Sequence, residues 1–186
     1  MYSSGSAYRS CAVALLGVKH SGKTSVGRSL SLRTGIPFVD LDDEIVKHSD
    51  YSSAREIYTS IGRAGFHALE HRVLRSLSPS ENGLILATGG GIADNPDALG
   101  LLTPRYFRIY LAEHVDVLYD RIIRGGLPPF LSPERPKLDF LQLFARRDRI
   151  YRTASDIVID CNGLTINEVT ATAESQLTQH AAQGDR

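Results

Sequence analysis

The segment GVKHSGKTSVG at residues 17–27 decides the fold of this chain. Residues 17–24 fit the pattern G-x-x-x-x-G-K-[ST], which is typical of a phosphate-binding loop between a strand and a helix. The apolar run CAVALL at residues 11–16 precedes the loop and a helical pattern follows it. In such a loop, backbone N–H groups turn toward phosphate oxygens, and the positive end of the next helix dipole faces them. We therefore predict a nucleoside triphosphate site; the alternative is a glycine-rich turn that binds nothing.

The side chains of this loop have separate expected roles. We predict that Lys23 contacts the β and γ phosphates and takes part in catalysis, and that the Thr24 hydroxyl binds Mg²⁺. His20 is expected to face the solvent. The other loop residues that we assign to nucleotide binding are Gly17, Lys19, Ser21, Gly22 and Ser25.

The composition of the whole chain limits the classes of protein that fit. The 186 residues, 42% of them apolar, suit one domain, predicted at residues 10–180 between flexible tails at 1–9 and 181–186. The 21 Lys and Arg residues balance 21 Asp and Glu residues, so no net charge attracts nucleic acid or an anionic membrane. No apolar window has the length of a signal-peptide core or a membrane span. We expect a cytoplasmic monomer whose partner is a small molecule.

Short β-rich runs alternate with stretches of helical period along the chain. The runs lie at residues 11–16, 38–40, 83–87, 107–111 and 156–160. This alternation predicts the α/β class, with a parallel sheet that carries helices on its faces. Residues 124–137, RGGLPPFLSPERPK, combine glycines, prolines and charges, so we predict a long loop that acts as a lid.

The segment GLILATGGG at residues 83–91 helps to decide whether the protein transfers a phosphoryl group or uses a nucleotide to drive movement. Motors and switch GTPases need an acidic residue at the end of such an apolar strand, whereas this strand ends in Thr88 and Gly89, Gly90 and Gly91. Glycines beyond the carboxyl end of a strand let a substrate approach bare backbone. The segment therefore favours a kinase, although a tight turn is the alternative for the glycines.

Two carboxylates in FVDLDDEI at residues 38–45 are candidate catalytic groups. Asp40 and Asp42 are two residues apart, so on an extended backbone they would point the same way, into the crevice above the strand ends. One would help to hold Mg²⁺ and the other would accept the proton of an acceptor hydroxyl. Asp43 and Glu44 would begin the next helix. The alternative for Asp40 and Asp42 is a helix N-cap and a solvated charge.

With these motifs in place, the chain resembles the shikimate kinase family from about residue 12 to 178. The resemblance is carried, in order, by GVKHSGKTSVG, FVDLDDEI, IGRAGFHALE, LATGGGI, RIIRGGLPPFL and RRDRIY. It implies a P-loop domain with a five-stranded parallel sheet in the order 2-3-1-4-5. It also implies ATP with Mg²⁺ as the phosphate donor and the 3-hydroxyl of shikimate as the acceptor.

The resemblance also implies roles for single residues. Thr24 and Asp40 would be the magnesium partners, and Asp42 would hold the acceptor hydroxyls. Arg121 would stack on adenine, and Arg147 would bind the acceptor carboxylate. The acceptor pocket would be lined by Gly89, Gly90 and Gly91.

Three positions depart from the family pattern. His67 stands where the family has an arginine for the acceptor carboxylate, Pro128 where it has a lid arginine, and Arg63 where it has a glutamate. We expect His67 either to face the substrate or to be a packed residue, and we expect Arg124 or Arg135 to replace the lid arginine. Two alternatives remain open: a different polyol or sugar-acid acceptor, and a non-catalytic nucleotide-binding relative.

Overall fold

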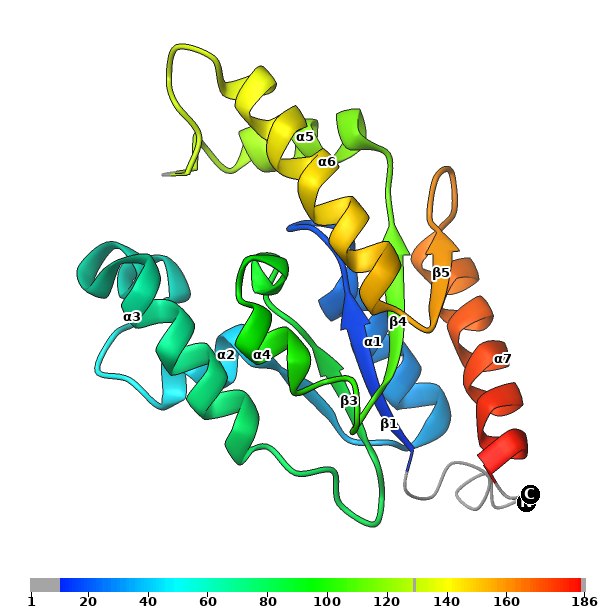
Figure 1. Ribbon diagram of the computed structural model, residues 1–186. Helices are drawn as coiled ribbons and strands as arrows, with labels where there is room; N and C mark the ends of the chain where they lie inside the picture. The colour runs from blue at the N-terminus through cyan, green and yellow to red at the C-terminus, as the bar shows by residue number, and fades with distance from the viewer. Residues whose placement is uncertain (1–10, 129, 185–186) are drawn as a thin grey trace.

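Five parallel strands form the centre of the molecule, which is seen in a computed structural model that describes residues 11–128 and 130–184 (Figure 1). Their order is β2-β3-β1-β4-β5, so the predicted sheet order is confirmed. The predicted tail at residues 1–9 lies outside the described residues. The strands are β1 (Ala12–Leu16), β2 (Phe38–Asp40), β3 (Leu84–Ala87), β4 (Phe107–Ala112) and β5 (Ile157–Asp160).

The helices follow the strands in alternation, as the sequence predicts. They are α1 (Lys23–Thr34), α2 (Leu41–Lys47), α3 (Ala54–Ser76), α4 (Pro96–Gly100), α5 (Val115–Arg124), α6 (Pro136–Ala154) and α7 (Ile166–Gly184), with a 3₁₀ turn, η2, at Ile92–Asp94. Within the described ranges, no helix is both long and apolar enough to cross a membrane.

The helix α7 extends past the predicted domain boundary at residue 180. It runs to Gly184, whereas residues 185–186 lie outside the described residues. Leu177 is fully buried, and the His180 ring stacks on Phe107 of β4 with the ring centroids 4.1 Å apart. These contacts hold α7 against the sheet as far as residue 180, and the helix itself continues to Gly184. The flexible tail from residue 181 stays a prediction.

Each face of the sheet buries its own core. In β1, Val13 and Leu15 face a cluster that includes α1 and α7, while Ala14 and Leu16 face a cluster that includes α2, α3 and α6. Figure 1 shows α7 on one side of the sheet and α2, α3 and α4 on the other. Because strands covered on both faces bury every side chain, β1 is continuously apolar instead of alternating.

The helix α3 is bent at Gly62, where the backbone leaves helical geometry with φ 69° and ψ −179°. A positive φ of this kind suits glycine, which has no Cβ to clash. The segment after the bend buries Leu69, Glu70 and Val73. The bend therefore sets the direction of the helix segment that carries Arg63 and His67.

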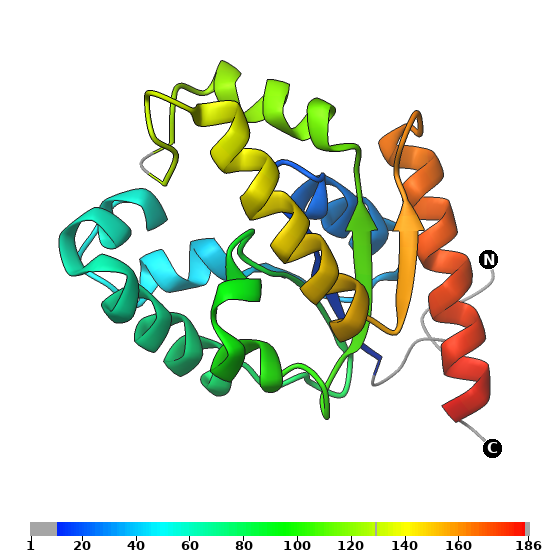
Figure 2. The same ribbon diagram turned by 45° about the horizontal axis from the view of Figure 1, so that its top comes forward.

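Residues 125–128 and 130–135 connect α5 and α6 without a helix or strand, so the predicted irregular segment is confirmed there. Its predicted ends are not part of the loop, since Arg124 is the last residue of α5 and residues 136–137 begin α6. Gly126 has a φ of 85° directly after α5. Figure 2 shows the loop beyond the carboxyl ends of the strands, extending from α5 and α6 toward the bent part of α3. Leu131 is buried and ties the base of the loop to the core.

Candidate functional site

The phosphate loop runs from the end of β1 to the start of α1. Gly22 precedes the helix with φ 93°, and no side chain caps the helix N-terminus. The first N–H groups of α1 are therefore left for an outside acceptor, which suits a phosphate at the positive end of the helix. His20 has a φ of 66°, the only positive value of a non-glycine residue in the described part of the chain.

Lys23 lies inside the curve of this loop. Its Nζ donates hydrogen bonds to the carbonyl oxygens of Gly17 at 2.9 Å and Val18 at 3.1 Å. Burial lowers the pKa of Lys23 to about 8, although Asp42 and Asp40 oppose this effect. The loop thus holds the ammonium group where its hydrogen bonds to carbonyl oxygens can be replaced by hydrogen bonds to phosphate oxygens.

A cavity of about 670 Å³ opens over the phosphate loop and the carboxyl ends of the strands. A volume of this size is ordinary for a small-molecule site. The predicted site residues that line it are Lys19, Gly22, Lys23, Thr24, Ser25, Asp40, Asp42, Gly90 and Arg121, and the residues not assigned to the nucleotide or acceptor are His20, Thr88, Arg124 and Ile166.

Two predicted nucleotide-binding residues support the loop without lining this cavity. Ser21 is buried, and its Oγ has no hydrogen-bond partner among the described residues. A Cβ added at Gly17 would collide with that Oγ and would come within 3.0 Å of the carbonyl oxygen of Leu111. The glycine is therefore needed for the close approach of the loop to its own residues and to β4. His20 is exposed, as expected, but it also borders the cavity.

Asp40 and Asp42 both line the cavity, but not by the geometry that the sequence suggested. The strand β2 ends at Asp40 and α2 begins at Leu41, so the predicted extended backbone between the two carboxylates is wrong. Asp40 is the N-cap of α2, and its Oδ1 accepts a hydrogen bond from the backbone N–H of Asp42 at 3.1 Å. The helix turn brings the Asp42 carboxylate to the cavity from the first turn of α2.

Thr24 and Asp40, the pair predicted to hold magnesium, are hydrogen-bonded to each other. The Thr24 hydroxyl donates to Asp40 Oδ2 at 2.7 Å, beside the phosphate loop. Two hard oxygen donors next to a phosphate site fit Mg²⁺, which takes few protein ligands and completes its shell with water and phosphate oxygens.

Gly89, predicted to line the acceptor pocket, is not among the residues that line the cavity, but it lies close to two carboxylates. A Cβ placed there would lie 2.8 Å from Asp42 Oδ1 and 3.2 Å from Glu70 Oε1, so both carboxylates converge on this point. Burial raises the pKa of Asp42, and the charge of Asp40 adds to the increase. Burial also raises the pKa of Glu70 to about 7, against a hydrogen bond from Asn95 that lowers it. Only glycine fits this position without displacing a carboxylate.

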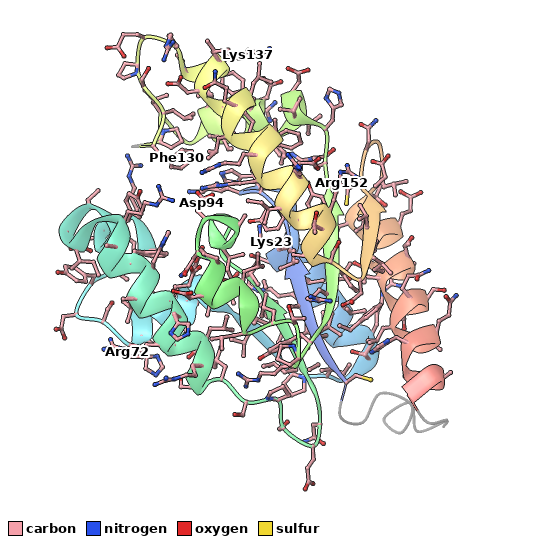
Figure 3. The ribbon with its side chains drawn as sticks, viewed as in Figure 1. Lys23, Arg72, Asp94, Phe130, Lys137 and Arg152 are labelled. Atoms are coloured by element: carbon pink, nitrogen blue, oxygen red, sulfur yellow. The ribbon has the colours of Figure 1, made fainter. Side chains whose placement is uncertain are left out.

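Arg147 on α6 is not among the residues that line the cavity, but it contacts Gly90, which does line it, and it pairs with Asp94. Its Nη2 is 2.7 Å and its Nε 3.3 Å from Asp94 Oδ2, and its Nη1 donates to the carbonyl oxygen of Gly90 at 3.0 Å. The ring of Phe130 lies 6.0 Å from the guanidinium carbon. Figure 3 shows Asp94 and Phe130 in the region between α3 and α6, with Arg72 toward the far end of α3.

Two arginines of α5 border the cavity but differ in their partners. Arg121 donates to the carbonyl oxygen of His20 at 3.0 Å and pairs with Glu113 at 3.1 Å. Arg124 is exposed and has no hydrogen bond or ion pair within the described ranges. The predicted adenine residue is therefore fixed to the phosphate loop, whereas the next arginine along the helix is not.

The departing positions also have definite surroundings. Pro128 is buried in the loop, and its carbonyl oxygen accepts the N–H of Leu131 at 3.1 Å. His67 is half-buried, and burial together with the charge of Arg63 lowers its pKa. Pro128 therefore serves the loop's own structure, and a neutral His67 offers less to an anion than an arginine would.

Sequence reasoning did not assign Asp94, Asn95 or Glu70 to the site. Asn95 donates to Glu70 Oε2 at 2.8 Å and to the carbonyl oxygen of His67 at 2.9 Å, and so it connects η2 to α3. The one available indication was position, since Asp94 and Asn95 follow the glycines at the carboxyl end of β3.

The family model described as shikimate kinase matches residues 19–178. The shikimate kinase of Aromatoleum aromaticum is 35% identical over 148 residues, which are 80% of this chain and 83% of that protein. The shikimate kinase of Francisella philomiragia is 30% identical over 155 residues, 83% of this chain and 88% of that protein.

Solved structures give the same result. A shikimate kinase from Acinetobacter baumannii, in complex with shikimate, superposes with a TM-score of 0.85 at 28% identity, over 95% of this chain and 98% of that one. The enzyme from Aquifex aeolicus gives 0.76 at 30% identity, over 91% and 98%. A gluconokinase from Sinorhizobium meliloti, at 15% identity and a TM-score of 0.54, shares the fold alone.

Proposed function

Because the chain belongs to the shikimate kinase family, we propose that it transfers the γ-phosphate of ATP to the 3-hydroxyl of shikimate, with Mg²⁺ as cofactor. One observation carries the proposal: a single cavity brings together the phosphate-loop Lys23, the Thr24–Asp40 oxygen pair and the Asp42 carboxylate. The Acinetobacter relative was solved with shikimate, which supports this acceptor.

The donor side of the reaction depends on the phosphate loop and α1. The open N–H groups at the start of α1 and the Lys23 ammonium bind the β and γ phosphates, and Arg121 bounds the nucleotide side of the cavity. A bound Mg²⁺ would be held by Thr24 and Asp40 and would offset the negative charge of the phosphates. Positioning and charge neutralisation are the main contributions of a protein to phosphoryl transfer.

The acceptor side depends on Asp42. Its raised pKa makes it a stronger base than an ordinary aspartate, which suits the removal of a hydroxyl proton. The acceptor oxygen forms a bond to the γ-phosphorus, and the bond from phosphorus to the β,γ-bridging oxygen breaks with its electron pair left on ADP. The hydroxyl proton goes to the Asp42 carboxylate.

Arg147 is the cation that we assign to the acceptor carboxylate, because it lies beside Gly90 and Gly91 at the carboxyl end of β3. A guanidinium group binds a carboxylate through two parallel hydrogen bonds. With His67 in place of an arginine, this chain brings one guanidinium fewer to the acceptor, and we infer weaker binding of the acid than in relatives that have both.

Acceptor-dependent release of ADP tests the proposed function. With ATP, Mg²⁺ and millimolar shikimate, the chain should release ADP, and Lys23→Ala and Asp42→Asn should each abolish the release. Matched reactions with gluconate test the sugar-acid alternative. Binding of ATP without ADP release in the presence of either acid would support the non-catalytic alternative and contradict the proposal.

We also propose that the enzyme acts in the cytoplasm as a monomer with a small-molecule acceptor. Family membership supports the location, and one chain is sufficient to form the cavity with Lys23, Thr24, Asp40 and Asp42. Size-exclusion chromatography with light scattering would test the oligomeric state, since a dimer would have twice the mass of 20.4 kDa.

A further inference from the structure

The cavity over the phosphate loop is bordered by four cationic side chains, Lys19, Lys23, Arg121 and Arg124. Two of them are already held by protein groups. Lys23 is bound to two carbonyl oxygens of its own loop. Arg121 is bound to the carbonyl oxygen of His20 and to the buried carboxylate of Glu113.

The bonds of Arg121 fix the face that α5 presents to the phosphate loop. Arg124 lies three residues further along the same helix, and residues at this spacing share a face. Leu118 and Ile122 are buried in the core, which keeps the helix from rotating. Because Arg121 fixes this face of the helix, Arg124 is also held on the side of α5 that borders the cavity.

The cavity that Arg124 borders is lined by residues that we assign to the phosphate donor and by residues that we assign to the acceptor. Thr24 and Lys23 stand on the donor side, and Asp42 and Gly90 on the acceptor side. Within the described part of the chain, Arg124 has no ion pair, so no bond must break before it contacts a phosphate. As the last residue of α5, it is followed by two glycines, Gly125 and Gly126, which place no side chain beside it.

Arg135, the other candidate in this region, has a different position. It is the N-cap of α6, it pairs with Asp139 at 3.6 Å, and it does not border the cavity. Its side chain is held by the first turn of its own helix, whereas Arg124 has no ion pair within the described ranges. The two arginines that the sequence could not separate are therefore distinguished by their surroundings.

We propose that Arg124 is a catalytic residue that donates hydrogen bonds to the non-bridging oxygens of the γ-phosphoryl group as it passes from ATP to the acceptor. This inference rests on the proposed function and names the residue that neutralises the transferring group. No proton moves to or from Arg124, since a guanidinium group stays charged. Its hydrogen bonds strengthen as charge develops on these oxygens.

The test compares Arg124→Ala and Arg124→Lys with Arg135→Ala. Arginines that contact a transferring phosphoryl group contribute about a thousand-fold or more to turnover, so Arg124→Ala should lower kcat at least about a hundred-fold. Arg124→Lys should keep part of the rate, and Arg135→Ala should match the wild type. Binding of a non-hydrolysable ATP analogue, measured by calorimetry, should stay within about three-fold, since the loop provides most ground-state contacts.

Two further measurements exclude a structural explanation. Melting temperatures of the variants should equal that of the wild type, because Arg124 is exposed and unpaired in the described structure. Added guanidinium ion should restore part of the activity of Arg124→Ala and none of that of Lys23→Ala. Turnover of Arg124→Ala within a few-fold of the wild type would overturn the proposal while leaving the proposed function intact.

Failure of the proposed function gives a different result. Absence of shikimate-dependent ADP release from the wild-type protein would contradict shikimate as the acceptor. The slow transfer of the γ-phosphoryl group to water would then be measured in the wild type and in Arg124→Ala. Arg124→Ala should lower this basal hydrolysis as well. Equal basal rates in Arg124→Ala and the wild type would overturn the role of Arg124.

Discussion

Arg147 Nη2 lies 2.7 Å from Asp94 Oδ2, and both side chains are only 10% exposed. Asp94 also pairs with Arg146 at 2.8 Å. Burial alone would raise the pKa of Asp94, but the hydrogen bond and charge of Arg147, with the charges of Arg146 and Arg63, lower it below its usual range. The arginine that we assign to the acceptor carboxylate is thus already neutralised by a carboxylate of the protein.

This pairing predicts that Asp94→Asn strengthens acceptor binding. Removing the negative charge leaves Arg147 with more attraction for the carboxylate of shikimate. The KM for shikimate should therefore fall several-fold, with kcat little changed. The lost ion pair should cost about 1 to 3 kcal/mol of unfolding free energy. The exposed carboxylate of Asp97 provides the control, because Asp97→Asn should change neither quantity. A rise in KM would show instead that Asp94 orients Arg147 for binding.

Glu70 predicts a pH dependence of stability. Its pKa is about 7 in the folded chain and near 4.5 in the unfolded one, so the folded state binds the extra proton between these values. Stability therefore falls as pH rises from about 4.5 to about 7, by up to about 1.4 kcal/mol for each unit of pKa difference.

Glu70→Gln should remove this slope, since the amide oxygen can still accept the hydrogen bond of Asn95. Urea denaturation at pH 5 and pH 8 measures the difference. The free energy of unfolding of Glu70→Gln should rise relative to that of the wild type as pH rises. Parallel stability profiles for the two proteins would mean that Glu70 is not a buried charge.

His67→Arg should improve the binding of shikimate. His67 has a lowered pKa and is neutral at pH 7, whereas an arginine would offer a charged pair of donors near Arg147 and Asp94. We expect the KM for shikimate to fall about ten-fold, which corresponds to about 1.4 kcal/mol. His71→Arg adds the same charge one turn further along α3 and should have little effect. An unchanged KM in His67→Arg would place this side chain outside the acceptor site.

Asp40→Asn should weaken the use of Mg²⁺ without unfolding α2. Asparagine can still cap the helix by accepting the N–H of Asp42, but it removes the charge beside Thr24. The Mg²⁺ concentration for half-maximal velocity should rise about ten-fold or more. Asp43→Asn serves as the control, because this exposed carboxylate lies three residues further along and does not line the cavity. Equal Mg²⁺ dependence in both variants would contradict the role of Asp40.

Much of the fold could be predicted from local pattern, because the features that decide it are local. The phosphate loop between an apolar strand and a helix identified the cavity, and the short β-rich runs identified the five strands. The local sequence pattern gave a wrong prediction at the place where a helix follows a strand with no loop between them. The three-residue strand β2 is followed immediately by α2, so the spacing of Asp40 and Asp42 was interpreted with the wrong backbone.

The acceptor end was harder to predict, because its contacts join distant parts of the chain. Asp94 and Arg147 are 53 residues apart, and Asn95 and Glu70 are 25 apart. Neither pairing has a local sequence pattern, since each depends on how η2 packs against α6 and α3. For the same reason, the sequence offered Arg124 and Arg135 equally, and their different surroundings are visible only in the folded chain.

The most direct test of the central claim is the ³¹P NMR spectrum of the purified chain with ATP, Mg²⁺ and shikimate. Transfer to the hydroxyl predicts that the γ-phosphate signal of ATP is lost and that a phosphate monoester and ADP appear in equal amounts, with neither formed by Asp42→Asn. Inorganic phosphate in place of the monoester, or a spectrum that does not change, would contradict it.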